Sequence, residues 1–184
     1  VVDGVIVFDS PARAEGQHSV LRLTTDPIPV VRVGFIGLGM RGPGAVERFT
    51  YLDGVEIKAL CDLYPDRVEK SQEILAGRNL PAAAAYSGEE GWKELCRRDD
   101  IDLVYICTPW QLHVPMAVYA MEHGKHVAVE VPAAMSLEEC WQLVDTAEKT
   151  QRHCMMLENC VYDFFELTTL NMAQHGLFGE IIHT

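Results

Sequence analysis

The chain has 184 residues, of which 48% are apolar and 23% charged, and its formal net charge is −12. That length suits one substantial α/β domain and is too short for two. The acidic balance, without any Lys/Arg cluster, argues against binding to nucleic acid or to anionic membranes, and no run of about 18 apolar residues offers a membrane span.

Residues 1–30 are interpreted as an N-terminal appendage or linker. Residues 5–8 and 19–24 could pair as a hairpin, and Pro27 and Pro29 then separate them from the first long apolar run. The chain starts at Val1 without a methionine or a charged leader. We therefore expect a periplasmic or exported protein if a leader was removed, and a cytoplasmic one otherwise.

A glycine-rich turn comes directly after the first apolar run, residues 31–37. Its glycines have the GxGxxG spacing of a dinucleotide-binding unit: the first makes the tight turn, the second lets the backbone approach a pyrophosphate, and the third lets the helix pack close to the strand. The phosphates then lie at the helix N-terminus. The predicted cofactor turn comprises Gly37, Gly39, Met40, Arg41 and Gly42. The Arg41 side chain either reaches a phosphate or lies in solvent.

The second apolar run, residues 55–61, ends in a carboxylate. Asp62 stands where such an acid accepts hydrogen bonds from the adenosine ribose hydroxyls, and its charge repels a 2′-phosphate. NAD, rather than NADP, is therefore the predicted cofactor. The structural alternative makes Asp62 a cap before Pro65.

Beyond residue 30, short apolar runs alternate with amphipathic stretches, which predicts an α/β fold with a doubly wound parallel (Rossmann) sheet in the order 3-2-1-4-5-6. The strands are expected at residues 31–37, 55–61, 83–86, 103–108, 126–131 and 153–158. Helices are expected after Gly42, from Pro65, over about 89–98 and 114–123, and after Ser136.

The helix after Ser136 carries the clearest signature, because Ser136 and Glu139 form a capping box. Apolar residues then recur at helical spacing, and we expect them to face the core. They are Leu137, Cys140, Trp141, Val144 and Ala147.

Near the C-terminus a helix is expected over about 162–175, stopping at Gly176, and residues 179–184 should begin a strand without a partner in this chain. We therefore expect an NAD-binding domain at 31–160, and at 161–184 a connecting helix with the start of a missing C-terminal α/β domain.

Six cysteines lie in apparent strands and helices without a CxxC pair, so we expect buried free thiols. They are Cys61, Cys96, Cys107, Cys140, Cys154 and Cys160. His123 and His126 flank Gly124 with poor geometry for a metal pair, and no metal site is predicted.

In open α/β sheets the ligand lies beyond the carboxyl ends of the strands. The candidates there are Thr108, Trp110, His113, Glu130, Asn159 and Tyr162. Trp110 either forms an apolar wall against the cofactor or is a partly exposed packing aromatic. His113 either donates to a substrate or cofactor hydroxyl or faces water. Glu130 needs hydrogen bonds, near the ribose or the carboxamide, because an unpaired carboxylate would be costly there.

Three motifs resemble the Gfo/Idh/MocA oxidoreductase family: the glycine turn, Cys107-Thr108-Pro109 with His113, and the stretch 124–132. Sugar dehydrogenases of that family usually read Glu-Lys-Pro in the third motif, where the lysine assists proton transfer at the hydroxyl being oxidised. Val131 occupies the lysine position here. Lys125 does not replace it, because it lies at the opposite end of the strand.

A longer combination of motifs resembles glycoside hydrolase family 109, whose known activity is α-N-acetylgalactosaminidase. These motifs lie at residues 34–44, 108–113, 130–134, 158–160 and 179–183. The resemblance implies that tightly held NAD⁺ oxidises the sugar at C3, which acidifies the C2 proton. Elimination of the glycosidic oxygen, addition of water and return of the hydride then complete a redox-neutral hydrolysis.

The resemblance also implies that the tyrosine and histidine acting on the sugar lie mostly beyond Thr184, and that Tyr162 contributes to the sugar pocket. The chain by itself is then expected to bind NAD without turning over an N-acetylgalactosamine-type glycan. Two alternatives stay open: an NAD-dependent sugar dehydrogenase, disfavoured by Val131, and a dinucleotide-binding module without catalysis. A homo-oligomer is also left open.

Overall fold

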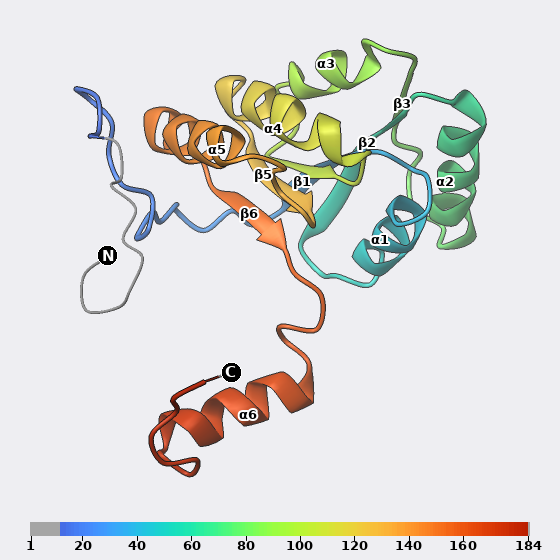
Figure 1. Cartoon of the computed structure of the whole chain (residues 1–184). Helices are drawn as coiled ribbons and strands as arrows, with labels where there is room; N and C mark the ends of the chain where they lie inside the picture. The colour runs from blue at the N-terminus through green and yellow to red at the C-terminus, as the bar shows by residue number, and fades with distance from the viewer. Residues whose placement is uncertain (1–11, 184) are drawn as a thin grey trace.

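The computed structural model describes residues 12–183 and shows a six-stranded parallel sheet with helices on both faces (Figure 1). The strand order is β3-β2-β1-β4-β5-β6, which confirms the predicted doubly wound topology. The strands are β1 (Val31–Ile36), β2 (Val55–Asp62), β3 (Ala84–Ser87), β4 (Leu103–Ile106), β5 (His126–Glu130) and β6 (Cys154–Leu157).

Each connection between strands carries a helix, as parallel strands require. The helices are α1 (Gly42–Phe49), α2 (Pro65–Gly77), α3 (Gly91–Cys96), α4 (His113–Glu122) and α5 (Leu137–Thr150), with a 3-10 turn at Trp110–Leu112 before α4. A further helix, α6 (Phe164–Gln174), comes after β6. The strands and helices predicted between residues 31 and 175 agree with these to within a few residues.

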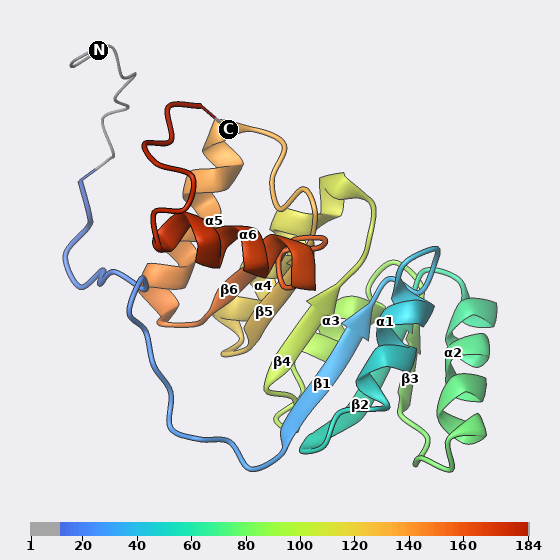
Figure 2. The same cartoon turned by 90° about the horizontal axis from the view of Figure 1, so that it is seen from below.

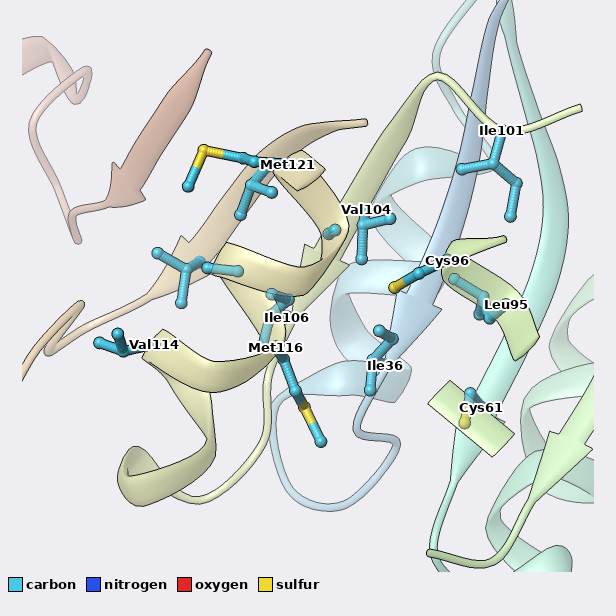
Figure 3. Packing of buried hydrophobic residues seen from close by; sticks show 14 of the residues in the cluster. Ile36, Cys61, Leu95, Cys96, Ile101, Val104, Ile106, Val114, Met116 and Met121 are labelled. Atoms are coloured by element: carbon cyan, nitrogen blue, oxygen red, sulfur yellow. The ribbon is translucent and has the colours of Figure 1, made fainter. Parts of the chain in front are cut away.

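Two hydrophobic cores hold the helices on the sheet. On one face, Ile36, Val104 and Ile106 of the central strands lie beneath α4, whose Met116 and Met121 cover them (Figure 3). On the other face, α1 and α2 cover the sheet with a second set of buried apolar side chains. Because both faces of the central strands are covered, these strands appear in the sequence as continuous apolar runs.

The side of α5 that is buried differs from the side expected from the sequence. Ser136 caps the helix as predicted, since its side chain accepts from the Glu139 amide. Leu137 and Val144, however, are 59% and 41% exposed, and the buried positions are Leu143, Ala147 and Glu148. The prediction is confirmed for Ala147, Trp141 is half-buried, and it was wrong for Leu137, Cys140 and Val144. Helical spacing alone does not show which of two neighbouring stripes faces the sheet, and a glutamate was not considered as a core residue.

Residues 13–20 form a strap along α5, which explains the burial of Glu148 (Figures 1 and 2). Arg13 holds the Glu148 carboxylate with two hydrogen bonds of 2.8 Å, and Gln17 donates to the same group. The side chain of Gln151 donates to the His18 carbonyl, and Val20 packs on the core. The N-terminal segment is thus attached to the domain.

Two expected strands are absent. Residues 19–24 form a turn and irregular chain instead of half a hairpin, and the other half, residues 5–8, lies outside the described residues. Residues 179–183 likewise form no strand, and Thr184 is not described. A strand needs a neighbour for its backbone hydrogen bonds, and none of the described residues offers one at either place.

The helix α6 stands apart from the sheet in Figure 1 and buries none of its residues. Phe164 and Phe165 at its start are 86% and 75% exposed. None of the helices within residues 12–183 is long and apolar enough to cross a membrane.

All six cysteines are free thiols, but the prediction of burial was wrong for Cys140 and Cys160, which are exposed. Cys140 lies on the same solvent-facing stripe of α5 as Val144, and Cys160 lies in the irregular segment between β6 and α6. Burial raises the pKa of the Cys61 and Cys96 thiols to about 12, so both stay protonated and pack as small apolar side chains.

A histidine pair joins β5 to the chain entering β6 at the end of the sheet opposite the glycine turn. The His153 amide donates to Nδ1 of His126 over 3.0 Å, so His126 must be unprotonated at that atom. Burial, then the neighbouring His153 and Arg152, lowers the pKa of His126, while Asp102 acts weakly in the other direction.

This arrangement predicts a loss of stability in mild acid. Because the pKa of His126 is lower in the folded chain than its ordinary 6.5, the unfolded chain binds the proton first. The free energy of unfolding should therefore fall as the pH falls through about 6.5, the unfolded-state value. Chemical denaturation at about pH 8 and about pH 5 should show a smaller fall for His126→Asn than for the parent. An equal fall in both would contradict the assignment; His175→Asn, which changes an exposed histidine at the end of α6, is the control.

The strap predicts a second stability effect. Arg13→Ala removes both hydrogen bonds to Glu148 and leaves that carboxylate against α5 without its cation, so the melting temperature should drop and proteolysis within residues 13–20 should accelerate. The double variant Arg13→Ala, Glu148→Ala should lose less than the two single losses added together. Strictly additive losses would show that the two side chains do not interact. Arg22→Ala, which removes an exposed arginine nearby in the sequence, serves as the control.

Candidate cofactor site

A cleft of about 1060 Å³ lies at the carboxyl ends of the strands. Residues after all six strands line it, so the topology brings together segments that are distant in the sequence. Gly37, Gly39, Met40, Arg41, Asp62, Thr108, Trp110, His113, Glu130 and Asn159 are among the lining residues. All ten are candidates predicted from the sequence; Gly42 lies just behind the lining, at the start of α1.

The glycine turn is shaped by close backbone contacts. Gly37 has φ of +93°, which an L side chain rarely adopts, and a Cβ there would lie 2.6 Å from the Cys107 backbone. A Cβ on Gly42 would lie 2.0 Å from the Gly37 carbonyl oxygen. Only glycine therefore lets α1 begin against the turn. A Cβ on Gly39, in contrast, would meet no backbone, and the nearest group is the Arg67 guanidinium at 3.4 Å. The main chain at Gly39 is open to the cleft.

Asp62 braces this turn from the end of β2. Its Oδ2 accepts from the Leu38 amide over 2.6 Å, and its Oδ1 accepts from the Tyr64 amide over 3.0 Å. The second contact closes a turn before α2, but the cap considered from the sequence is not formed, because the N-cap residue of α2 is Tyr64 and it has no side-chain cap. The Arg67 guanidinium also donates to Oδ1, over 3.4 Å. Because a carboxylate has about four lone-pair directions, these three bonds leave acceptor capacity for one more donor.

The 3-10 turn after β4 forms one wall of the cleft. Trp110 is 57% exposed on this turn and presents its ring to the cleft rather than to the core. Thr108, at the end of β4, has a buried hydroxyl oxygen that finds no hydrogen-bond partner among the described residues. A buried hydroxyl without a partner in a cleft lining is satisfied when a polar ligand binds.

His113 differs from both alternatives drawn from the sequence. The ring is 1% exposed, and its two nitrogens lie 2.7 Å from the Pro132 carbonyl oxygen and 2.8 Å from the Thr108 carbonyl oxygen. The ring therefore lies between the segment after β4 and the segment after β5, away from water. A neutral imidazole carries a single N–H, so it donates to one of these two carbonyls. The sequence indicated a histidine near the site, but it did not show that both ring nitrogens lie against backbone carbonyl oxygens.

Glu130 is held at the end of β5 by two groups. Tyr105 donates its hydroxyl to Oε1 over 3.1 Å, and Nε of Arg41 lies 3.9 Å from Oε2. The carboxylate has partners as expected, but they are protein groups, and its place near the ribose or the carboxamide stays a prediction. Arg41 thus reaches across from the glycine turn to β5. Val131, next to Glu130 in the lining, stands at the position where the sugar dehydrogenases carry lysine.

The remaining candidates divide into two groups. Glu158 and Asn159, after β6, reach the lining, whereas Tyr162 is 71% exposed and does not contribute to it. Burial, with the Glu130 charge, raises the pKa of the Cys107 thiol to about 12, which removes this thiol as a nucleophile. Lys125 lies at the other end of β5 and donates to the Arg98 carbonyl.

The residues present suit a dinucleotide. The first turn of α1 has no side-chain cap, so the amides of Gly42 and Gly44 keep donor capacity for a phosphate oxygen beside the open main chain of Gly39. The Thr108 hydroxyl has no hydrogen-bond partner among the described residues, and the Asp62 carboxylate has acceptor capacity left. They offer hydrogen bonds to a ligand at two separate places in the cleft. Bound there, NAD would supply a hydride acceptor and donor.

For metals the described part of the chain offers little. Within residues 12–183 no three His, Cys, Asp or Glu side chains gather closely enough to hold an ion.

Comparison with known proteins agrees with this geometry. Residues 31–158 match the family described as "GFO_IDH_MocA: Oxidoreductase family, NAD-binding Rossmann fold". The chain is 67% identical over 175 residues to "Glycosyl hydrolase family 109 protein 1" of Bacteroides fragilis, covering 95% of this chain and 38% of that protein. It is 60% identical over 171 residues to an "Alpha-N-acetylgalactosaminidase" of Bacteroides fragilis, covering 93% of this chain and 40% of that protein.

Among solved structures, the WlbA dehydrogenase of Bordetella pertussis in complex with NADH and UDP-GlcNAcA resembles the chain with a TM-score of 0.71. Its identity is 20%, and the match covers 83% of this chain and 44% of that one, so it supports the fold alone. The family match spans most of the chain and every segment that builds the cleft except Asn159. The chain belongs to the Gfo/Idh/MocA oxidoreductase family, and residues 31–158 are its NAD-binding Rossmann domain.

Proposed function

We propose that this chain is the cofactor-binding part of an NAD-dependent glycosidase that hydrolyses α-N-acetylgalactosaminides by transient oxidation at C3, elimination, addition of water and re-reduction. The chain spans about 38% of the length of the Bacteroides fragilis relative. In this proposal the groups that act on the sugar lie outside this chain. The relative named alpha-N-acetylgalactosaminidase, at 60% identity, supports the substrate class.

The observation that carries the proposal is that Val131, and not a lysine, stands next to Glu130 in the described cleft lining. Of the neighbouring side chains, Glu130 contacts Tyr105 and Arg41, and the His113 nitrogens lie against two carbonyl oxygens, while Glu158 is an exposed carboxylate after β6. The Cys107 thiol stays protonated. A dehydrogenase that used the third motif for proton transfer would need a base at that place. In a glycosidase of the proposed type, the groups that act on the sugar come from the second domain.

Within this proposal the residues of the chain bind and orient the cofactor. The amides at the start of α1 hold the pyrophosphate, and Asp62 accepts from the ribose of the adenosine half. Trp110 covers one side of the nicotinamide half as an apolar wall that excludes water. Thr108 and Asn159 provide polar partners, and Arg41 offers a cation to the phosphates or to Glu130. His113 holds the segments after β4 and β5 in a fixed position relative to each other.

The activity can be tested by joining this chain at Thr184 to the remaining region of the Bacteroides fragilis relative. The product should release N-acetylgalactosamine from an aryl α-glycoside without added cofactor and without accumulating NADH, because the hydride returns in each turnover. Stoichiometric NADH formation from sugars without cleavage of a glycoside would establish the dehydrogenase instead. NAD binding with neither activity would indicate the non-catalytic module.

The cofactor assignment can be tested on the 184-residue chain. Asp62→Ala removes the acceptor for the ribose and the brace of the Leu38 amide, so NAD binding should weaken by about 1–3 kcal/mol. The matched control is Asp66→Ala, which removes an exposed acid of α2 that pairs with Lys70. Titration calorimetry gives both affinities. If Asp62→Ala bound NAD as tightly as Asp66→Ala does, the assignment of Asp62 would be wrong.

A further inference from the structure

Tyr105 carries a hydroxyl in the otherwise apolar central strand β4, and it is only 6% exposed. A phenylalanine would bury the same ring without taking a hydroxyl out of water, which costs free energy unless the hydroxyl finds a partner. The partner of Tyr105 is a residue of the cleft lining, because its hydroxyl donates to Oε1 of Glu130 over 3.1 Å. A hydrogen bond therefore connects the core to the cofactor cleft.

Two phenylalanines fix the direction of the Tyr105 ring. The ring centroid of Phe35, in β1, lies 5.2 Å from that of Tyr105, and the centroid of Phe49, at the end of α1, lies 5.6 Å from it with the planes at 86°. On β5, Tyr105 is paired with Ala128, and Glu130 lies two positions further along, on the same face of the sheet. The packed ring thus directs its hydroxyl to the end of β5.

The Glu130 carboxylate is held in one orientation by contacts on both oxygens. Tyr105 donates to Oε1, Nε of Arg41 lies 3.9 Å from Oε2, and the Glu130 side chain is 14% exposed. Burial, followed by the neighbouring Cys107 and Glu130, raises the pKa of Tyr105 well above its ordinary 10, so the phenol keeps its proton and donates. The lone pairs that the phenol does not use remain for donors in the cleft.

We propose that Tyr105 is a positioning residue for the cofactor: its hydroxyl holds the Glu130 carboxylate in the orientation that accepts a hydrogen bond from the nicotinamide half of NAD. The donors of that half are the ribose hydroxyls and the carboxamide. The proposal rests on NAD being the cofactor and on the predicted place of Glu130 beside this half. Because an acceptor that is already oriented loses little rotamer freedom when the cofactor binds, the phenol makes NAD binding tighter.

The experiment measures the dissociation constants of NAD and of ADP for the 184-residue chain by titration calorimetry. ADP carries the adenosine and two phosphates but no nicotinamide half. Tyr105→Phe keeps the ring and removes the hydroxyl, so it should weaken NAD binding about tenfold and leave ADP binding unchanged. A general loosening of the fold would weaken the binding of both ligands.

Tyr119→Phe is the matched control. The Tyr119 hydroxyl is also buried, but it has no hydrogen-bond partner among the described residues, and Tyr119 lies outside the cleft lining. Its removal should therefore leave both dissociation constants unchanged.

A second pair of variants tests whether Tyr105 acts through Glu130. Glu130→Ala should itself weaken NAD binding, and adding Tyr105→Phe should then cause no further loss, since the carboxylate that the phenol holds is gone. Thermal unfolding of each variant checks that the fold is retained. The comparison of NAD with ADP needs only Tyr105→Phe, so it decides the role of Tyr105 even if Glu130→Ala does not fold.

The outcomes separate the inference from the cofactor assignment on which it rests. A parent chain and a Tyr105→Phe chain that bind NAD equally well overturn the role of Tyr105 and leave the NAD site intact. An equal loss of NAD and ADP binding in Tyr105→Phe, or a further loss of NAD binding when it is added to Glu130→Ala, likewise overturns it. A parent chain that binds no NAD overturns both.

Discussion

The hydrogen bond from the Leu38 amide to the Asp62 carboxylate connects the two segments on which the cofactor site depends. It fixes the glycine turn to the end of β2, and thereby fixes where α1 begins and where its uncapped amides point. The close approach of Gly42 to the Gly37 carbonyl has the same effect from the helix side. If this turn moved outward, the Arg67 guanidinium would no longer lie beside Gly39, and the two halves of the cleft would no longer be continuous.

Much of this arrangement could be predicted from the sequence because the signals are local. The GxGxxG spacing, the acid at the end of the second apolar run and the alternation of strand and helix arise from steric and hydrogen-bonding needs within about thirty residues. The topology rule then placed the ends of β4, β5 and β6 at the same edge. The ten lining residues were found in this way, and the strand order is confirmed.

The features that escaped prediction depend on contacts between distant segments. Arg13 and Glu148 are 135 positions apart, and neither residue alone indicates that a glutamate of α5 is buried. The two carbonyls that hold His113 come from separate segments, and the return of Arg67 toward Asp62 depends on how α2 leaves the sheet. Tyr162 comes soon after the last strand, and its ring is exposed outside the cleft lining, so its place in a sugar pocket stays a prediction.

The bridge made by His113 has an implication for protein engineering. Because one imidazole ring spans the Thr108 and Pro132 carbonyls, the segments after β4 and β5 behave as a single mechanical unit. If only one of these two loops were replaced by that of another family member, the His113 ring and the carbonyl that it contacts would come from different proteins. Recombination between relatives should therefore exchange residues 108–113 and 130–132 as one cassette.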